Sequence, residues 1–386
     1  MAINYNYKAG LNNNFEENKT LINNLSANNG KSVIVENLKD FITGNFEKLG
    51  NDLILTREDG AYSIIRDYFN FDPPPNLTDN AGISLKGSLI ARLSGSLNAK
   101  QLAQTNSSES IQEIGSVETL EGNVTAERID GSIVTLNVGD PVFLGDILVT
   151  GLGSSLAVIL IDETTFALSE DGEMVLDELI YDPGTGTGSG SFSLLKGATS
   201  FVTGQIAEYG DDAMKLDTPV ATIGFRGTKV VVAFDPQSSE ISIINRPEIQ
   251  STGQAEVGQI ALFVGGVEVG TVDSSNSGWQ FSAGQVPQAR TFSEREVSSI
   301  GDKVESVVNQ ITGQRAPSRT NDSDNDENNS EDQASSEESV SDDESQDGES
   351  EEENKNNKSK KNHHKKKGRN NKKRRREHKN NDKKKP

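Results

Sequence analysis

From Ile114 onward the sequence alternates short apolar runs with turns rich in glycine and aspartate, and this rhythm constrains the fold more than any other feature. Apolar residues alternate along each run, as in a strand with one buried face. Turn signals at intervals of about 8–12 residues are typical of an all-β domain rather than of alternating strands and helices. The sequence therefore predicts a mainly β protein of short strands, partly solenoid-like or sandwich-like. The turns are Glu121-Gly122, Asp130-Gly131, Gly139-Asp140-Pro141, Gly145-Asp146, Thr150-Gly151 and Asp171-Gly172.

A helix and a hairpin are predicted ahead of this region. Residues 33–50 carry apolar residues at a spacing that fits a short amphipathic helix. Two alternating runs then flank an Asp59-Gly60 pair, which predicts a β-hairpin. The apolar positions of the expected helix are Val35, Leu38, Phe41 and Ile42.

A second helix is predicted near residue 300. Ser293 followed by Glu296 is a capping box, in which each side chain bonds the backbone of the other. An apolar stripe at helical spacing follows, so we expect a helix over about residues 294–311 that packs on the β domain. The stripe is Val297, Ile300, Val304, Val307, Val308 and Ile311.

Charge divides the end of the chain into two blocks. Residues 321–353 hold 16 acidic residues and no basic one, and residues 355–386 hold 17 Lys or Arg against two acidic residues. Of the 38 basic and 59 acidic residues of the chain, 21 basic and 41 acidic residues remain for residues 1–320. Neither block carries enough apolar surface to fold, so both are predicted to be disordered.

These observations give seven predicted parts. They are a loose Asn-rich N-terminus (1–32), a short helix with a β-hairpin (33–75), a linker (76–113), a β domain with a β extension (114–284), a C-terminal helix (285–312), a disordered acidic segment (313–354) and a disordered polybasic tail (355–386).

Residue types exclude several chemistries from the β domain. All three histidines lie in the basic tail and the chain has no cysteine, so Ser–His–Asp and Cys–His nucleophiles and Zn sites built on Cys or His are excluded there. The apolar runs are far shorter than the roughly 20 residues of a membrane helix. A secretory signal peptide has a basic segment followed by an apolar run, and the first residues of this sequence show no such pattern. We expect no enzymatic activity, no cofactor, no metal, no small-molecule substrate and no membrane span.

The stretch TPVATIGFRGTKVVVAF (218–234) places an arginine between two glycines at the corner of two apparent strands. Gly224 and Gly227 permit positive φ or a close backbone approach, and Arg226 offers five donors in a fixed fork. We expect Arg226 to serve the structure by binding carbonyls or a carboxylate such as Asp140, Asp146 or Asp162. A partner- or ligand-binding role is the alternative. The structural motif residues are Gly224, Arg226, Gly227, Thr228, Gly139, Asp140, Gly145 and Asp146.

Three stretches together resemble the FecR-like domain. They are GSVETLEGNVTAERIDGSIVTLNVGDPVFLGDILVTG, ATSFVTGQIA and TPVATIGFRGTKVVVAF, which span residues 115–234. The segment DETTFALSEDGEMVLDELIYDP is similar to the version found near the N-terminus of large secreted adhesin-like proteins of Gram-negative bacteria. The preceding NDLILTREDGAYSIIRDYF resembles the short β prefix of such proteins.

The resemblance implies an all-β, non-enzymatic domain outside the cytoplasm: in the periplasm, at the cell surface or secreted. In iron-transport regulators of the family, the domain contacts an outer-membrane receptor and passes a signal to a sigma factor. Those regulators have a cytoplasmic anti-sigma segment and a membrane helix, and we expect neither in this sequence. The adhesin-like version continues into extracellular repeats, so we expect either a short or a truncated relative.

The acidic residues of one segment allow a second interpretation. Carboxylates at Asp171, Glu173, Asp177, Glu178 and Asp182 have the chemistry of a Ca²⁺ site, but no EF-hand or calcium-repeat pattern is present. Solvated strand edges and turns are therefore the expected role of these residues.

The polybasic tail, residues 355–386, suits a polyanion such as nucleic acid, anionic lipid or lipopolysaccharide. Transient pairing of the tail with the acidic block is the other interpretation, and the one that we slightly favour. The leading hypothesis is a binding or scaffold module of the bacterial envelope or surface that contacts proteins or glycans. An extracytoplasmic signal relay and polyanion binding through the tail are the alternatives.

Overall fold

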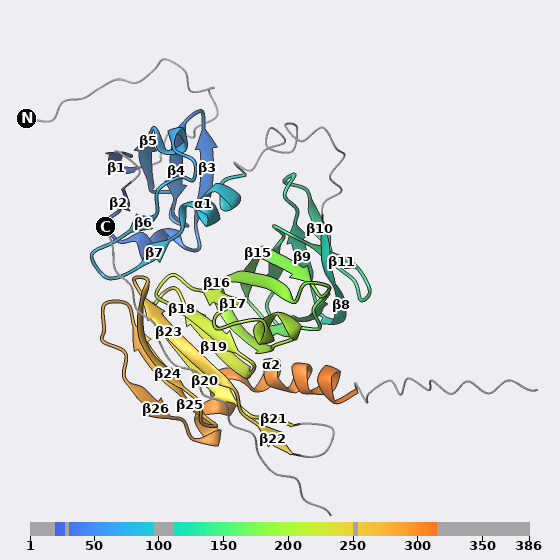
Figure 1. Ribbon diagram of the computed structural model, residues 1–386. Helices are drawn as coiled ribbons and strands as arrows, with labels where there is room; N and C mark the ends of the chain where they lie inside the picture. The colour runs from blue at the N-terminus through green and yellow to red at the C-terminus, as the bar shows by residue number, and fades with distance from the viewer. Residues whose placement is uncertain (1–19, 28–30, 96–111, 250–253, 315–386) are drawn as a thin grey trace, which may run out of the picture. The chain divides into compact units, whose positions relative to one another are not determined.

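The computed structural model describes residues 20–27, 31–95, 112–249 and 254–314 (Figure 1). Its largest part is mainly β, as predicted: most of the strands between residues 113 and 291 form one hydrogen-bonded system that curls around a shared core. This β body has two layers. No helix within the described ranges has the length and hydropathy needed to cross a membrane.

The first layer is antiparallel throughout, in the order β11-β8-β13-β14-β16-β19-β20-β25-β26. Its strands are β8 (Glu113–Glu121), β11 (Pro141–Phe143), β13 (Ser155–Leu160), β14 (Thr165–Leu168), β16 (Thr187–Val202), β19 (Lys229–Asp235), β20 (Glu240–Arg246), β25 (Ser277–Ser282) and β26 (Ala289–Thr291).

The second layer has the order β10-β9-β12-β15-β16-β17-β18-β23-β24, with β16 and β17 parallel and the other pairs antiparallel. Besides β16, its strands are β9 (Val124–Glu127), β10 (Ile133–Thr135), β12 (Ile147–Thr150), β15 (Glu173–Asp182), β17 (Met214–Asp217), β18 (Thr222–Arg226), β23 (Gln259–Val264) and β24 (Val267–Val272). A separate small pair joins β21 (Glu248–Ile249) to β22 (Ala255–Glu256).

Strand β16 belongs to both layers. Its first half pairs with β15 and β17, and its second half, from Gly197 on, pairs with β14 and β19. Gly197 has φ +91°, and a Cβ there would lie 2.7 Å from the Cα of Gly172. Only glycine fits this change of layer, because it tolerates positive φ and has no Cβ.

Aromatic side chains fill the core between the layers. Phe166, Phe192, Phe201 and Phe225 are fully buried and come from β14, β16 and β18. The ring centroids of neighbouring pairs lie 5.3–6.2 Å apart, within the range of favourable aromatic contact.

Helix α2 (Glu294–Gln314) covers the outer side of the first layer, which confirms the predicted C-terminal helix. The capping box is present: the Ser293 N–H and Oγ each donate to the Glu296 carboxylate at 2.8 Å. These bonds lower the pKa of Glu296 to about 2. The helix lies close to the sheet, since a Cβ at Gly301 would be 2.5 Å from Val231 Cγ1. Its stripe Val304, Val308 and Ile311 packs on Ala157, Ala167 and Val202.

Residues 20–95 form a smaller part, which we call the N-terminal module. It holds a sheet β1-β5-β4-β3 and a sheet β2-β6-β7. Its elements are β1 (Leu21–Ser26), β2 (Val33–Ile34), the 3₁₀ turn η1 (Leu38–Phe41), β3 (Asn45–Leu49), β4 (Asp52–Thr56), β5 (Tyr62–Arg66), the 3₁₀ turn η2 (Tyr68–Asn70), β6 (Leu77–Thr78), β7 (Ser84–Leu85) and α1 (Gly87–Leu93).

The predicted hairpin is confirmed by the antiparallel pair of β4 and β5. The helix predicted within residues 33–50 is wrong: only η1 is helical, and Asn45–Leu49 form β3. Sheet pairing prevails over the helical spacing here because β3 pairs along its full length with β4. The four apolar residues of that spacing are nevertheless all buried.

Two predicted boundaries also change. The predicted loose N-terminus (1–32) contains β1, which pairs in parallel with β5, and the predicted linker (76–113) contains β6, β7 and α1. The acidic segment lies outside the described residues apart from its first two positions, and the polybasic tail lies entirely outside them.

Candidate functional site

The guanidinium of Arg226, at the end of β18, makes a two-pronged ion pair with Asp212. Its Nε donates to Oδ1 and its Nη2 to Oδ2, both at 3.2 Å, and its Nη1 donates to Gln259 Oε1 at 2.7 Å. The side chain is 19% exposed. The expected acceptors Asp140, Asp146 and Asp162 are therefore wrong. The carboxylate that Arg226 binds comes from the irregular segment before β17.

The neighbouring glycines serve this ion pair in different ways. A Cβ at Gly224 would lie 2.1 Å from Asp212 Oδ1, so only glycine leaves room for the carboxylate. Gly227 has φ +64° and turns the chain toward β19. The next residue, Thr228, is buried; its N–H donates to Thr203 Oγ1 at 2.9 Å and its Oγ1 to Asn245 Oδ1 at 2.5 Å.

Replacing Arg226 by alanine is expected to lower the free energy of unfolding by about 1.5 kcal/mol, because Asp212 and Gln259 lose their charged partner. Arg226→Lys should restore only part of the lost free energy of unfolding, since a lysine ammonium cannot make the two-pronged pair with Asp212. Urea denaturation measures both variants, with Asp211→Asn as the control: Asp211 is 84% exposed and 3.9 Å away. A variant that melts like wild type but loses partner binding would instead support the binding role.

The two Gly-Asp turns lie at the other end of the second layer. Gly139 and Gly145 have φ +87° and +82°, and Asp140 Oδ2 accepts the Asn137 N–H at 2.7 Å. Asp146 is fully buried and accepts the Phe143 N–H at 2.8 Å.

The carboxylate of Asp146 is incompletely paired. The guanidinium of Arg128 bonds its Oδ2, whereas among the described residues its Oδ1 has no hydrogen-bond partner. Burial raises the pKa of Asp146, against the lowering by the Phe143 N–H and by Arg128. These interactions fix the turn that leads into β12.

The N-terminal module contacts both turn motifs of the β body. The Ser84 N–H donates to the Pro219 carbonyl at 2.7 Å, in the same turn as Thr218. At the other motif, Arg92 Nε donates to the Gly145 carbonyl. Arg92 is 3% exposed, and its Nη2 also donates to the Glu127 carbonyl at 2.7 Å. Backbone carbonyls of both turns thus accept hydrogen bonds from the module, whose buried apolar residues also join the core of the β body.

A cavity of about 500 Å³ lies beside the Pro219 contact. Module residues Lys86 and Leu89 line one side, and Ser193, Val220 and Phe263 line another. Lys86 Nζ pairs with Asp217 Oδ2 at 2.5 Å at the edge of this space.

Two carboxyl groups near this contact have strongly raised pKa values. Burial raises the pKa of Asp177 to about 7, helped by the charge of Asp217. Burial also raises the pKa of Glu173 to about 7. Both residues lie on β15, where Asp177 has Asp217 and Lys86 nearby and Glu173 has Lys196 and Glu127 nearby.

The five acidic residues considered for Ca²⁺ do not converge. Asp171 pairs with Lys196 at 2.6 Å, Asp182 accepts the Gly184 N–H at 2.9 Å within its own turn, and Glu178 bonds Ser189. Within the described ranges no group of three or more His, Cys, Asp or Glu residues is arranged to hold a metal ion.

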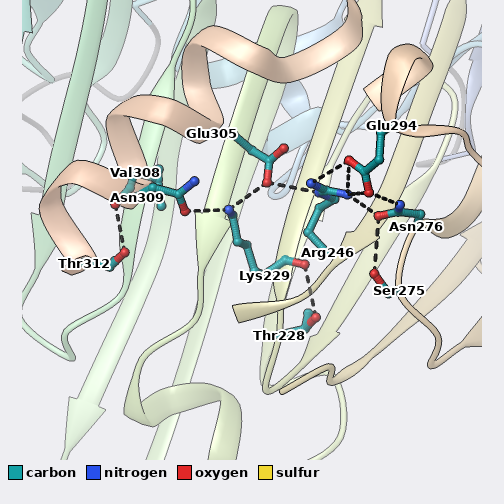
Figure 2. Close-up of polar contacts among 10 residues, drawn as sticks. All are labelled: Thr228, Lys229, Arg246, Ser275, Asn276, Glu294, Glu305, Val308, Asn309 and Thr312. Carbon is teal, nitrogen blue, oxygen red and sulfur yellow. Dashed lines mark hydrogen bonds and ion pairs between the residues drawn. The ribbon is translucent and has the colours of Figure 1, made fainter. Parts of the chain in front are cut away.

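A buried charge cluster joins α2 to the first layer (Figure 2), and sequence reasoning missed it. Lys229 Nζ lies 2.7 Å from Glu305 Oε1 and donates to Asn309 Oδ1 at 2.8 Å. Arg246 Nε lies 3.0 Å from the same Glu305 oxygen. Lys229 and Arg246 are directly opposite each other on β19 and β20, so Glu305 neutralises two adjacent cations.

The outer end of the cluster is looser. The guanidinium of Arg246 bonds the Asn276 side chain and reaches Glu294 at 3.4 Å, where the Glu294 side chain is 72% exposed. One sequence signal pointed to the cluster: Lys229 precedes an apolar run and is two residues from Val231, so both lie on the helix-covered side.

Comparison with known proteins identifies the middle of the body. The family model described as FecR protein matches residues 146–245, from Asp146 before β12 to Asn245 in β20. These residues form a FecR-like domain. The match includes Gly224, Arg226 and Gly227. Of the two Gly-Asp turns it includes only Asp146. No curated protein matches the chain.

Several solved structures are similar to parts of the chain. One, described as a cell surface anchoring domain, is 32% identical over 16% of this chain and 82% of its own, with a TM-score of 0.16. Two of an anti-sigma factor candidate from Parabacteroides distasonis are 11% and 12% identical, with TM-scores of 0.29 and 0.30. Each alignment covers 40% of this chain. It covers 63% of the first anti-sigma factor structure and 62% of the second.

Proposed function

We propose that this chain is a non-enzymatic FecR-domain protein of the bacterial cell envelope that relays or regulates an extracytoplasmic signal through contacts with a protein partner. The observation that carries the proposal is the FecR match, which covers the strands from β12 to β20 that make up the centre of both layers. One turn within the matched residues, at Pro219, accepts the Ser84 N–H through its backbone carbonyl, a mode of contact suited to protein partners.

Two measurements test the proposal in the native host. Cell fractionation should find the full chain in the envelope fraction, and deletion of its gene should change the transcription of envelope-response genes. Recovery of the chain from the cytoplasm alone would sink the envelope placement. If the chain is found in the envelope but the deletion leaves transcription of the envelope-response genes unchanged, the signal-relay role is rejected. The scaffold role would then remain.

A binding or scaffold role with glycan contacts is the second candidate, and one surface feature favours it. Tyr181 and Tyr209 stack near-parallel, at 11° and 6.3 Å between centroids, and both are partly exposed. A tyrosine offers an apolar ring face and a hydroxyl that hydrogen-bonds, so it suits ligands such as sugars that have both apolar and hydrated surfaces. Alanine at Tyr181 should then abolish retention of the chain by envelope glycans, whereas Tyr181→Phe, which keeps the stacked ring, should preserve it.

Polyanion binding through the tail is expected to be separable from the folded body. Removing residues 355–386 should abolish retention on heparin, because the remaining 320 residues before the charged blocks carry 21 basic against 41 acidic residues and repel a polyanion. Removing the acidic residues 321–353 is the matched control and should preserve retention. A tail-deleted chain that still binds heparin would refute the tail as the site.

A further inference from the structure

The side chains of a lysine, a glutamate and an asparagine converge where helix α2 meets strand β19 (Figure 2). The Lys229 ammonium lies 2.7 Å from Glu305 Oε1 and donates to the carboxamide oxygen of Asn309, Oδ1, at 2.8 Å. Glu305 and Asn309 are four residues apart on α2, so both reach Lys229 from the same side of the helix. An amine, an amide carbonyl and a carboxylate therefore meet at one point.

These three groups have the chemistry needed to form an amide within the chain. A lysine amine is a nucleophile once it has lost its proton, and a carboxylate within hydrogen-bond distance, here Glu305, can take that proton. The hydrogen bond to Oδ1 polarises the carbonyl of Asn309, which makes its Cγ the electrophile. That carbon is one C=O bond, about 1.2 Å, from Oδ1 and therefore lies within about 4 Å of Lys229 Nζ.

The charge balance of the cluster favours this reaction. The side chains of Lys229 and Arg246 are largely buried, and both lie against the same Glu305 oxygen. The second carboxylate near Arg246, that of Glu294, is exposed. The buried part of the cluster therefore holds two cations and one anion, and an unbalanced buried charge costs free energy. Conversion of the Lys229 ammonium into a neutral amide leaves Arg246 and Glu305 as one balanced pair.

We propose that Lys229 and Asn309 form an isopeptide bond that covalently joins β19 to α2. Glu305 takes a proton from the Lys229 ammonium, and the neutral Nζ attacks Cγ of Asn309. The Nζ–Cγ bond forms, the Cγ–Nδ2 bond breaks, and Nδ2 leaves with the two protons that Nζ has released. One ammonium and one carboxamide thus become one secondary amide and one ammonium ion. Glu305 ends as a carboxylate, and no oxidant or reductant is consumed.

The surroundings of the three groups suit both the attack and the departure of ammonia. Lys229 and Glu305 are buried, whereas Asn309 is exposed, so the amine is kept from water and the leaving ammonia can reach it. Val304 and Val308 pack on the first layer and hold α2 in place, so a fixed geometry replaces a bimolecular encounter. The bond would join positions 80 residues apart in the chain and keep α2 on the sheet.

Mass spectrometry of the folded chain tests the bond directly. The intact mass should be one ammonia below the mass of the sequence. After combined digestion by trypsin and a glutamate-specific protease, residues 227–240 and 306–315 should appear as one linked peptide that is uncut after Lys229. Ammonia lost at another asparagine would also lower the mass, so the linked peptide decides. A folded chain whose digest contains only unlinked peptides overturns the proposal.

Three variants assign the roles of the residues. Asn309→Ala removes the electrophile and Glu305→Gln removes the base, so both should show the full mass of their sequences and no linked peptide. Gln310→Ala, at the exposed neighbouring position, is the matched control and should keep the linked peptide. A linked peptide that persists in Asn309→Ala would refute the assignment, and one that forms in Glu305→Gln would refute Glu305 as the base. Should Glu305→Gln fail to fold, Asn309→Ala decides, because Asn309 is exposed.

Discussion

Glu305→Ala is expected to lower the free energy of unfolding by about 3 kcal/mol or more, because it leaves Lys229 and Arg246 as adjacent buried cations with no anion between them. The Lys229 and Arg246 side chains are only 4% and 13% exposed, so water cannot replace the carboxylate. Because α2 also covers Ala157 and Val202, a loosened helix would expose apolar surface on the first layer. Urea denaturation with tryptophan fluorescence measures the loss, since the single Trp279 lies on β25 in the same layer.

Glu294→Ala is the matched control. Glu294 belongs to the same helix and contacts the same Arg246, but at 3.4 Å and with a side chain that is 72% exposed. Its loss should change the free energy of unfolding by less than about 1 kcal/mol. Replacing Lys229 and Glu305 together by methionine should cost less than Glu305→Ala alone, because no buried charge is then left unpaired at β19. Equal effects of Glu305→Ala and Glu294→Ala would show that the cluster is not buried in solution.

Gly258→Ala is expected to be the second severe change, with a loss of about 3 kcal/mol or failure to fold. A Cβ at Gly258 would lie 1.6 Å from the Gly227 carbonyl oxygen and 2.4 Å from its carbon. Both are backbone atoms, so β23 would have to move away from the Arg226 corner. That movement would also strain the bond between Arg226 and Gln259.

Gly270→Ala provides the comparison for Gly258. Gly270 lies in β24, the neighbour of β23, with negative φ and no atom within 4 Å of its Cβ position. Alanine there should change stability by no more than about 0.5 kcal/mol. Thermal melts of the two variants side by side measure the difference, and similar midpoints would mean that the tight approach at Gly258 does not exist.

Local patterns predicted the β body and α2 because each depends on short-range chemistry. The Gly-Asp turns require positive φ at Gly139 and Gly145, and the capping box of Ser293 and Glu296 is a contact over three residues. The expected helix near Leu38 failed for the opposite reason. Its apolar spacing correctly marked buried residues, but the pairing of β3 with β4 decided the backbone conformation.

The partners of charged residues were not readable from the sequence. The sequence identified Arg226 as a constrained cation, yet its acceptor, Asp212, lies in an irregular segment whose path no periodicity describes. Lys229 and Glu305 come from a strand and a helix far apart in the chain, and only the packing of α2 brings them together. Long-range ion pairs depend on the completed fold, so one sequence alone does not specify them.

The passage of β16 through both layers has a mechanical consequence. In a protein whose two sheets share no strand, only side chains and connecting loops join one sheet to the other. Here a single backbone ladder carries tension from one sheet directly into the other across Gly197. Residues 112–314 should therefore rupture as one unit under force, with a single peak rather than a staircase of sheet-by-sheet events.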